Sequence, residues 1–314
     1  MDLTRRDWMA ATAAGVALAG EVQAAPVPAE RDETIEPFGY CMNTSTISGQ
    51  KLPLVDELKL IAEVGYQGVE PWIRQIDEHV HSGGSLKDLG KRIADLGLAA
   101  PSVIGFFDWV VDDEARRRKG LEEARRNFEI VRAIGGKKLA APPAGATDRA
   151  DLDLHKAAER YAALIDLGAQ FDVVPELEFW GHSKRLGTLS EATFVAVESG
   201  RANACVLADV YHMYKGGSSP EGLRLLSGTA IGVFHFNDYP ADPPRARIDD
   251  SKRVYPGDGV GDLAAILRIL KANGYRGMLS LELFNRDYWK HDAREVAKTG
   301  LDKMRTVVRA ALGT

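Results

Sequence analysis

Short apolar runs alternate with longer amphipathic runs from about residue 38 onward. The apolar runs have the length and composition of buried parallel strands, and eight are predicted, at residues 38–42, 68–70, 99–103, 138–141, 173–179, 205–208, 231–236 and 279–283. The runs between them carry apolar residues at three- and four-residue steps, which predicts helices, the last over about residues 292–312. Several helical runs end at a glycine where a left-handed cap is expected: Gly65, Gly97, Gly135 and Gly274.

This uninterrupted series of strand–helix units predicts an α/β fold, a single (β/α)8 TIM barrel. A doubly wound open sheet is the alternative, but no Gly-rich phosphate turn follows the first predicted strand. In a TIM barrel the functional residues collect at the C-terminal ends of the strands. We therefore expect the chemistry of this chain at those ends.

The N-terminal residues depart from this pattern. The pair Arg5–Arg6 precedes a short run of small apolar residues and a small-residue cleavage pattern near Ala24, which predicts a twin-arginine export signal over residues 1–24. A linker rich in Pro and Glu is expected over 25–37, and the catalytic TIM barrel over 38–314. The signal predicts a periplasmic or extracytoplasmic protein, with no membrane attachment once the signal is removed.

Composition narrows the class of partner. The 314 residues are 45% hydrophobic and 27% charged, with a formal net charge of −5. Acids and bases are interspersed, so no basic face for nucleic acid is expected.

Cys41 and Cys205 are the only cysteines. Two cysteines make no disulfide framework for a domain of this size, and both are expected to be buried free thiols.

Four consecutive predicted strands carry acidic or imidazole side chains near their C-terminal ends. Glu176 and Glu178 lie two apart in one strand and therefore share a face, and the next three strands supply Asp209, His235 and Glu282. A carboxylate in a buried strand is costly without a partner, so this joint placement predicts a functional site. Carboxylates with one imidazole suit a single divalent metal, with Mn²⁺ expected first and Mg²⁺, Co²⁺ or Zn²⁺ as alternatives.

The segments LEFWG, LADVYHMYKGG, HFNDYP, RVYPGDGVGDL and GYRGMLSLELF resemble the sugar phosphate isomerase/epimerase family, which has a xylose-isomerase-like TIM barrel and includes inosose dehydratases, inosose isomerases and ketose 3-epimerases. The resemblance implies one divalent metal bound by Glu178, Asp209, His235 and Glu282, and a substrate contact from His212. Barrels of this family often pair, so a homo-oligomer is an open expectation.

Further candidates surround this set. Glu70 is a candidate for substrate hydroxyls, with helix capping as the alternative. Glu176 and Asp238 are expected to hydrogen-bond the metal ligands on the side away from the metal. Glu176 is equally consistent with a core carboxylate that a Lys or Ser inside the barrel satisfies. The long Pro-rich loop over 238–259 is expected to cover the substrate, with Arg253 in contact with it.

These residues predict a metal-dependent isomerase or epimerase. A metal polarises the carbonyl of a keto-sugar, and Glu178 and Glu282 then act as the catalytic carboxylates that remove and return the adjacent proton through an enediolate. The expected partner is a keto-sugar, cyclitol or oxidised glycoside, with Trp72 and Trp180 against its ring. Elimination in the same site would make a dehydratase or a lyase of 3-keto-glycosides. A non-catalytic extracytoplasmic sugar-binding protein is the alternative from another class.

Overall fold

The structure is a computed structural model that describes residues 36–313, so the predicted export signal and nearly all of the predicted linker lie outside the described residues. Its strands are β1 Gly39–Asn43, β2 Gly68–Glu70, β3 Lys138–Ala141, β4 Val174–Glu178, β5 Val206–Asp209, β6 Ile231–His235 and β7 Met278–Leu281. They form one sheet in the order β2-β1-β7-β6-β5-β4-β3, and every pair of neighbours is parallel.

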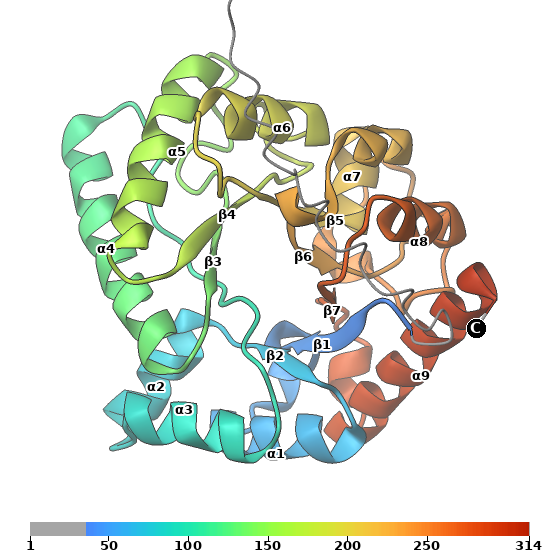
Figure 1. Ribbon diagram of the computed structural model, residues 1–314. Coiled ribbons are helices and arrows are strands. Elements are labelled where there is room, and N and C mark those ends of the chain that lie inside the picture. The colour runs from blue at the N-terminus through green and yellow to red at the C-terminus, as the bar shows by residue number, and fades with distance from the viewer. Residues whose placement is uncertain (1–35, 314) are drawn as a thin grey trace, which may run out of the picture. The chain divides into compact units, whose positions relative to one another are not determined.

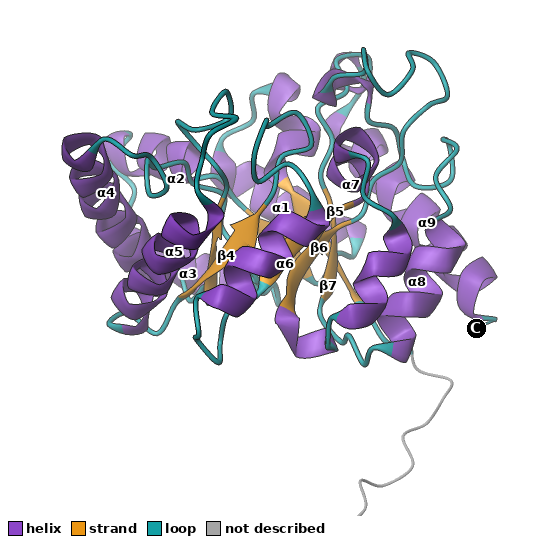
Figure 2. Cartoon of the chain, turned by 90° about the horizontal axis from the view of Figure 1, so that it is seen from above, coloured by secondary structure: helices purple, strands orange, loops and turns teal. Residues whose placement is uncertain are grey.

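Helices surround these strands (Figure 1), and the view from above places the strands inside the layer of helices (Figure 2). The helices are α1 Leu54–Val64, α2 Ile73–His81, α3 Leu86–Asp95, α4 Glu114–Ala133, α5 Leu154–Ala169, α6 Leu189–Glu198, α7 Val210–Gly216, α8 Leu263–Ala272 and α9 Ala293–Leu312. Short 3₁₀ helices span Thr44–Gln50, Pro220–Leu225, Gly228–Ala230, Asp250–Lys252 and Tyr288–Lys290. The glycines predicted to end helices all have positive φ, from 71° at Gly97 to 103° at Gly65.

The third predicted strand, residues 99–103, was wrong as a regular strand. Ala99 makes an isolated parallel bridge to β2, and Val103 makes one to β3. Pro101 lies between these two bridges and has no N–H group, so a continuous hydrogen-bond ladder cannot form across it. The segment nevertheless joins the two ends of the sheet and takes the place of the missing strand in the barrel.

Glu176 lies in the barrel interior, fully buried. Its Oε2 accepts a hydrogen bond from the backbone N–H of Val233 at 2.6 Å, whereas its Oε1 has no partner. A Cβ at Gly232 would lie 1.7 Å from Glu176 Oε2, so the carboxylate occupies space that only a glycine leaves free. The hydrogen bond of Glu176 therefore goes to the backbone of β6 and not to a predicted metal ligand.

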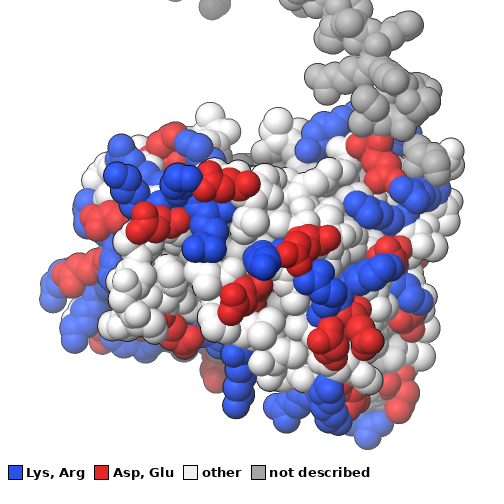
Figure 3. Space-filling view, turned by 90° about the horizontal axis from the view of Figure 1, so that it is seen from below, with Lys and Arg blue, Asp and Glu red and all other residues white. Residues whose placement is uncertain are grey.

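Both cysteines are buried and free, as predicted. Across residues 36–313, no helix combines the length and hydropathy needed to cross a bilayer. Lys and Arg side chains alternate with Asp and Glu across the face drawn in Figure 3. That surface matches the interspersed charge of the sequence, and it is unlike the continuous basic footprint of a nucleic-acid-binding face.

Candidate active site

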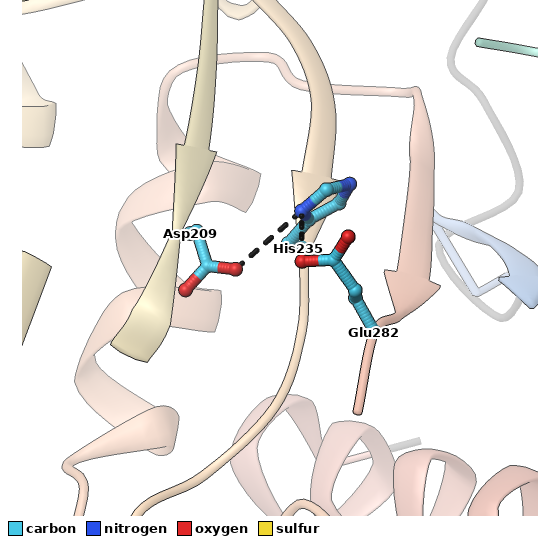
Figure 4. Close-up of side chains that lie close together, drawn as sticks. All are labelled: Asp209, His235 and Glu282. Atoms are coloured by element: carbon cyan, nitrogen blue, oxygen red, sulfur yellow. Dashed lines mark ion pairs between the residues drawn. The ribbon is translucent and has the colours of Figure 1, made fainter. Parts of the chain in front are cut away.

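Asp209, His235 and Glu282 turn toward one another at the C-terminal ends of three adjacent strands (Figure 4). Asp209 ends β5, His235 ends β6, and Glu282 directly follows β7. Parallel pairing sets Asp209 beside His235 in register. All three side chains are buried, and one ligand-capable atom from each lies within 4.8 Å of the others. The structure therefore brings together three of the four residues that were predicted as metal ligands.

The His235 ring is held from one side only. Its Nε2 lies 2.9 Å from Glu70 Oε2, while its Nδ1 lies 3.1 Å from Glu282 Oε2 and 3.4 Å from Asp209 Oδ2 without hydrogen-bond geometry. Burial alone would lower the pKa of His235, but the surrounding carboxylates outweigh burial and raise it well above the ordinary value. A buried ring nitrogen that faces two carboxylates without a hydrogen bond has the arrangement of a cation ligand, with Glu70 fixing the ring from behind.

Asp209 has a second task in the local structure. Its Oδ1 accepts a hydrogen bond at 2.8 Å from the backbone N–H of His212 and so caps the N-terminus of α7. Its Oδ2 accepts hydrogen bonds from Arg253 Nη1 at 2.9 Å and Asn237 Nδ2 at 3.1 Å. Burial would raise the pKa of Asp209, but Arg253 and the two nearby histidines lower it below the usual range. The cap fixes the direction of the carboxylate and the ion pair keeps it charged.

Glu178 and His212 also line the site. Glu178 ends β4, and its Oε1 lies 4.0 Å from His212 Nε2. His212 Nδ1 accepts a hydrogen bond from the backbone N–H of Gly181 at 3.2 Å. Burial, and then repulsion by Glu282, raise the pKa of Glu178 to about 8. Glu178 is not part of the group of three that converges within 4.8 Å. A cation between Glu178 and Glu282 would relieve their repulsion.

Arg253 reaches the site from the loop after β6 and is buried. Its Nη1 donates to Asp209 Oδ2 at 2.9 Å and to Glu282 Oε2 at 2.7 Å, and its Nη2 donates to Asp250. The guanidinium carbon lies 4.6 Å from the centre of the Tyr211 ring. Arg253 was predicted as a substrate contact, and the structure places it directly against two predicted metal ligands. Asp250, its partner in the loop, was missed by the sequence reasoning.

Glu70 does not cap a helix, because Trp72 occupies the N-cap position of α2. Its Oε2 bonds to His235 and accepts a hydrogen bond from Asn43 Nδ2 at 2.9 Å. The same Asn43 amide donates to Glu282 Oε1 at 3.1 Å, and its Oδ1 accepts from Trp72 Nε1 at 2.7 Å. Sequence reasoning missed Asn43, although its place at the end of the first strand was a usable signal.

Asp238 lies outside the group of predicted ligands. Its two carboxylate oxygens accept hydrogen bonds from the backbone N–H groups of Tyr239, Gly257, Gly259 and Gly261, at 2.8–3.1 Å. Its hydrogen bonds therefore tie together the two ends of the loop that carries Arg253, in place of the support for the metal ligands that was predicted. An Asp before a glycine-rich loop is consistent with this role, since such loops present free backbone N–H groups.

Glu178, His212, Arg253 and Glu282 form the buried floor of a cavity of about 520 Å³ that includes its open mouth. The cavity is lined by Trp72, Ile104, Phe106, Glu178, Trp180, His182, His212, Asp250, Arg253, Glu282 and Phe284. Trp72 and Trp180 were predicted to contact substrate, and both line the cavity. The polar side chains of the floor are buried, whereas Phe106 and His182 are exposed. The cavity therefore passes from a charged floor to an aromatic mouth.

Comparison with known proteins relates this arrangement to enzymes. The profile of the family described as xylose isomerase-like TIM barrel matches residues 58–307. A protein from Bacillus velezensis named inosose isomerase is 31% identical over 276 residues, which cover 85% of this chain and 96% of that protein. A protein from Pseudomonas aeruginosa named 3-dehydroshikimate dehydratase is 30% identical over 269 residues, which cover 82% of this chain but 40% of that protein.

The solved structure of IOLI protein with a bound zinc atom superposes on this chain with a TM-score of 0.82 and 25% identity, covering 87% of this chain and 99% of that one. The predicted TIM barrel is confirmed by this likeness and by the family match. The relatives are named as an isomerase and a dehydratase, which confirms the prediction of a sugar isomerase-like enzyme.

Proposed function

The chain belongs to the xylose isomerase-like TIM barrel family, and from that premise we propose that it is a divalent-metal-dependent isomerase or epimerase of a keto-sugar or cyclitol. One observation carries the proposal. His235 is buried, with Nε2 on Glu70 and Nδ1 facing Asp209 and Glu282 without a hydrogen bond. That donor set fits a divalent cation.

Glu178, Asp209, His235 and Glu282 would hold the cation, with Mn²⁺ as the first expectation and Zn²⁺, Mg²⁺ or Co²⁺ as alternatives. When bound, it would polarise a substrate carbonyl oxygen and so acidify the adjacent C–H. The zinc atom of the similar solved structure supports a divalent ion in a fold of this kind.

Two carboxylates in different surroundings suit the proton transfers. Glu282 accepts hydrogen bonds from Asn43 and Arg253, which fix the position of its carboxylate for the role of a base. Glu178 lines the same cavity and is the second carboxylate available to return the proton. His212 lines the same cavity and is placed to orient a substrate hydroxyl. Proton return to the opposite face gives epimerisation, and return to the neighbouring carbon gives isomerisation.

The first test is metal content after incubation with Mn²⁺ and desalting. We expect about one equivalent in the parent protein and a loss in His235→Ala. His182→Ala is the matched control, because His182 lines the same cavity and lies outside the converging group of three. Deuterium exchange from D₂O into an inosose and into ketopentoses then tests proton abstraction. A parent protein that binds no divalent metal and exchanges no deuterium would contradict the proposal and favour the non-catalytic sugar-binding protein.

Elimination is the second candidate function, and the relative named 3-dehydroshikimate dehydratase favours it. The same base would remove the proton, and a β-hydroxyl or glycosidic oxygen would then leave with the bonding electrons. The product of dehydration is a conjugated enone, which absorbs in the ultraviolet. Ultraviolet absorbance therefore distinguishes elimination from isomerisation when the same keto-sugars are tested. Release of an alcohol from a 3-keto-glycoside identifies a lyase.

The export signal also stands as a proposal, supported by Arg5–Arg6 and the apolar run that follows. Cell fractionation of the full chain, compared with a double Arg5→Lys, Arg6→Lys variant, tests it. We expect the parent in the periplasmic fraction and the variant retained inside the cell. Equal distribution of the two would contradict export by this route.

A further inference from the structure

Five ring-bearing side chains form a continuous arc around the cavity. Phe284 and Trp72 have ring centres 6.0 Å apart, Trp72 and Phe106 5.3 Å, Phe106 and Trp180 5.3 Å, and Trp180 and His182 5.5 Å. Successive rings meet edge to face, except for Trp180 and His182, which are stacked. The arc thus connects residues that follow β7, β2, β4 and the segment that replaces a third strand.

The arc leaves the buried floor and ends in solvent. Trp72 is 8% exposed, whereas Phe106 is 48% exposed. Within the described part of the chain, Phe106 is the only aromatic residue among the exposed large hydrophobic side chains. Keeping an aromatic ring in water forgoes the stabilisation that burial would give. Two neighbouring tryptophans hold the ring in place, so Phe106 is a fixed surface at the mouth.

Charge sets the kind of group that this mouth accepts. Two buried carboxylates, Glu178 and Glu282, line the floor, and Asp250 is a third acid in the lining. Among the described residues that line the cavity, Arg253 is the one side chain of fixed positive charge, and carboxylates already occupy both of its terminal nitrogens. These lining residues therefore offer no free cationic side chain to a ligand carboxylate or phosphate, whereas uncharged hydroxyl-bearing rings need none.

We propose that Phe106, Trp180 and His182 form a second-ring subsite at the mouth of the active site, and that the substrate is an uncharged glycoside. Its oxidised sugar ring lies on the charged floor, and its second ring packs on the aromatic arc. This second ring is a sugar or an aryl group, because both present the apolar face that an aromatic side chain binds. The inference rests on the proposed function, since it assigns the oxidised ring to the metal ligands.

The test is isothermal titration of the Mn²⁺-loaded protein with four probes that differ in one feature each. Methyl β-D-glucoside has one ring, phenyl β-D-glucoside adds an aryl ring, cellobiose adds a sugar ring, and phenyl β-D-glucuronide adds a carboxylate. One ring contact predicts about three- to tenfold tighter binding of a two-ring neutral probe. Whichever two-ring probe gains more identifies the second ring, and the glucuronide is expected to bind more weakly than phenyl glucoside.

Phe106→Ala should remove this gain and leave the affinity for methyl glucoside and the Mn²⁺ content unchanged. Leu225→Ala is the control, because Leu225 is 87% exposed and lies outside the cavity lining. Equal affinities for one- and two-ring probes, no binding of any glucoside, or a gain that persists in Phe106→Ala would each overturn the subsite. A protein that still binds Mn²⁺ and exchanges deuterium in those cases would retain the proposed function, so the two failures are distinguishable.

Discussion

Replacing Arg253 with Met tests whether a cationic side chain neutralises the proposed metal ligands. The guanidinium is 1% exposed and donates to Asp209 and Glu282 at 2.9 and 2.7 Å. Methionine keeps an apolar stem against the ring of Tyr211, so the main loss is the charge. Arg253→Met leaves two buried carboxylates facing each other without the charged donor that they share.

Removing one partner from a buried ion pair costs about 3–5 kcal/mol. For a chain of this size, each kcal/mol corresponds to about 2–3 °C in the melting temperature, so the metal-free variant should melt roughly 6–15 °C below the parent. Added Mn²⁺ should raise the melting temperature of Arg253→Met more than that of the parent, since the ion replaces the missing charge and binds the folded state. Scanning calorimetry with and without Mn²⁺ measures both effects.

Arg247→Met is the matched control, because Arg247 lies exposed in the same loop and in none of the ion pairs of the site. We expect the control to melt within about 2 °C of the parent, as is usual for surface substitutions. If Arg253→Met and Arg247→Met have the same metal-free melting temperature, the argument that Arg253 holds the carboxylates together is refuted. An equal response of parent and Arg253→Met to Mn²⁺ would instead refute the link between the guanidinium and the metal site.

Burial raises the pKa of Glu57 from an ordinary 4.5 to about 8, so folding favours its protonated form and the free energy of unfolding should fall as the pH rises between these values. Glu57→Gln should weaken this fall in urea titrations at pH 5 and pH 8.5, and an unchanged pH dependence would contradict the assignment. Asp238→Asn removes one acceptor oxygen for the backbone N–H groups of its loop, so the free energy of unfolding should fall by about 1–3 kcal/mol in the same titrations. An unfolding midpoint equal to that of the parent would show that the loop does not depend on this carboxylate. Gly232→Ala places a Cβ 1.7 Å from Glu176 Oε2 and should destabilise the fold by about 1–3 kcal/mol. Adding Glu176→Ala should recover part of this loss, because it removes the carboxylate that the new Cβ meets. If the double variant recovers no stability, the clash is not with Glu176.

Much of the barrel and the core of the candidate site followed from the sequence. Apolar runs predicted seven strands to within about two residues, because a buried parallel strand must be apolar on both faces. The same periodicity placed Asp209, His235 and Glu282 at strand ends. Parallel strands in a barrel have their C-terminal ends at one rim, so their convergence followed from the strand assignment alone.

Contacts between distant segments were decided only by the tertiary structure. Asn43 and Glu282 are 239 positions apart, and their hydrogen bond depends on the closing of β1 against β7. Arg253 pairs with Asp209 because the loop folds back over the site, held by Asp238. A linear pattern reports which face of an element is buried. It does not report which loop returns over that face or which ring nitrogen a distant carboxylate holds, since these depend on side-chain packing in three dimensions.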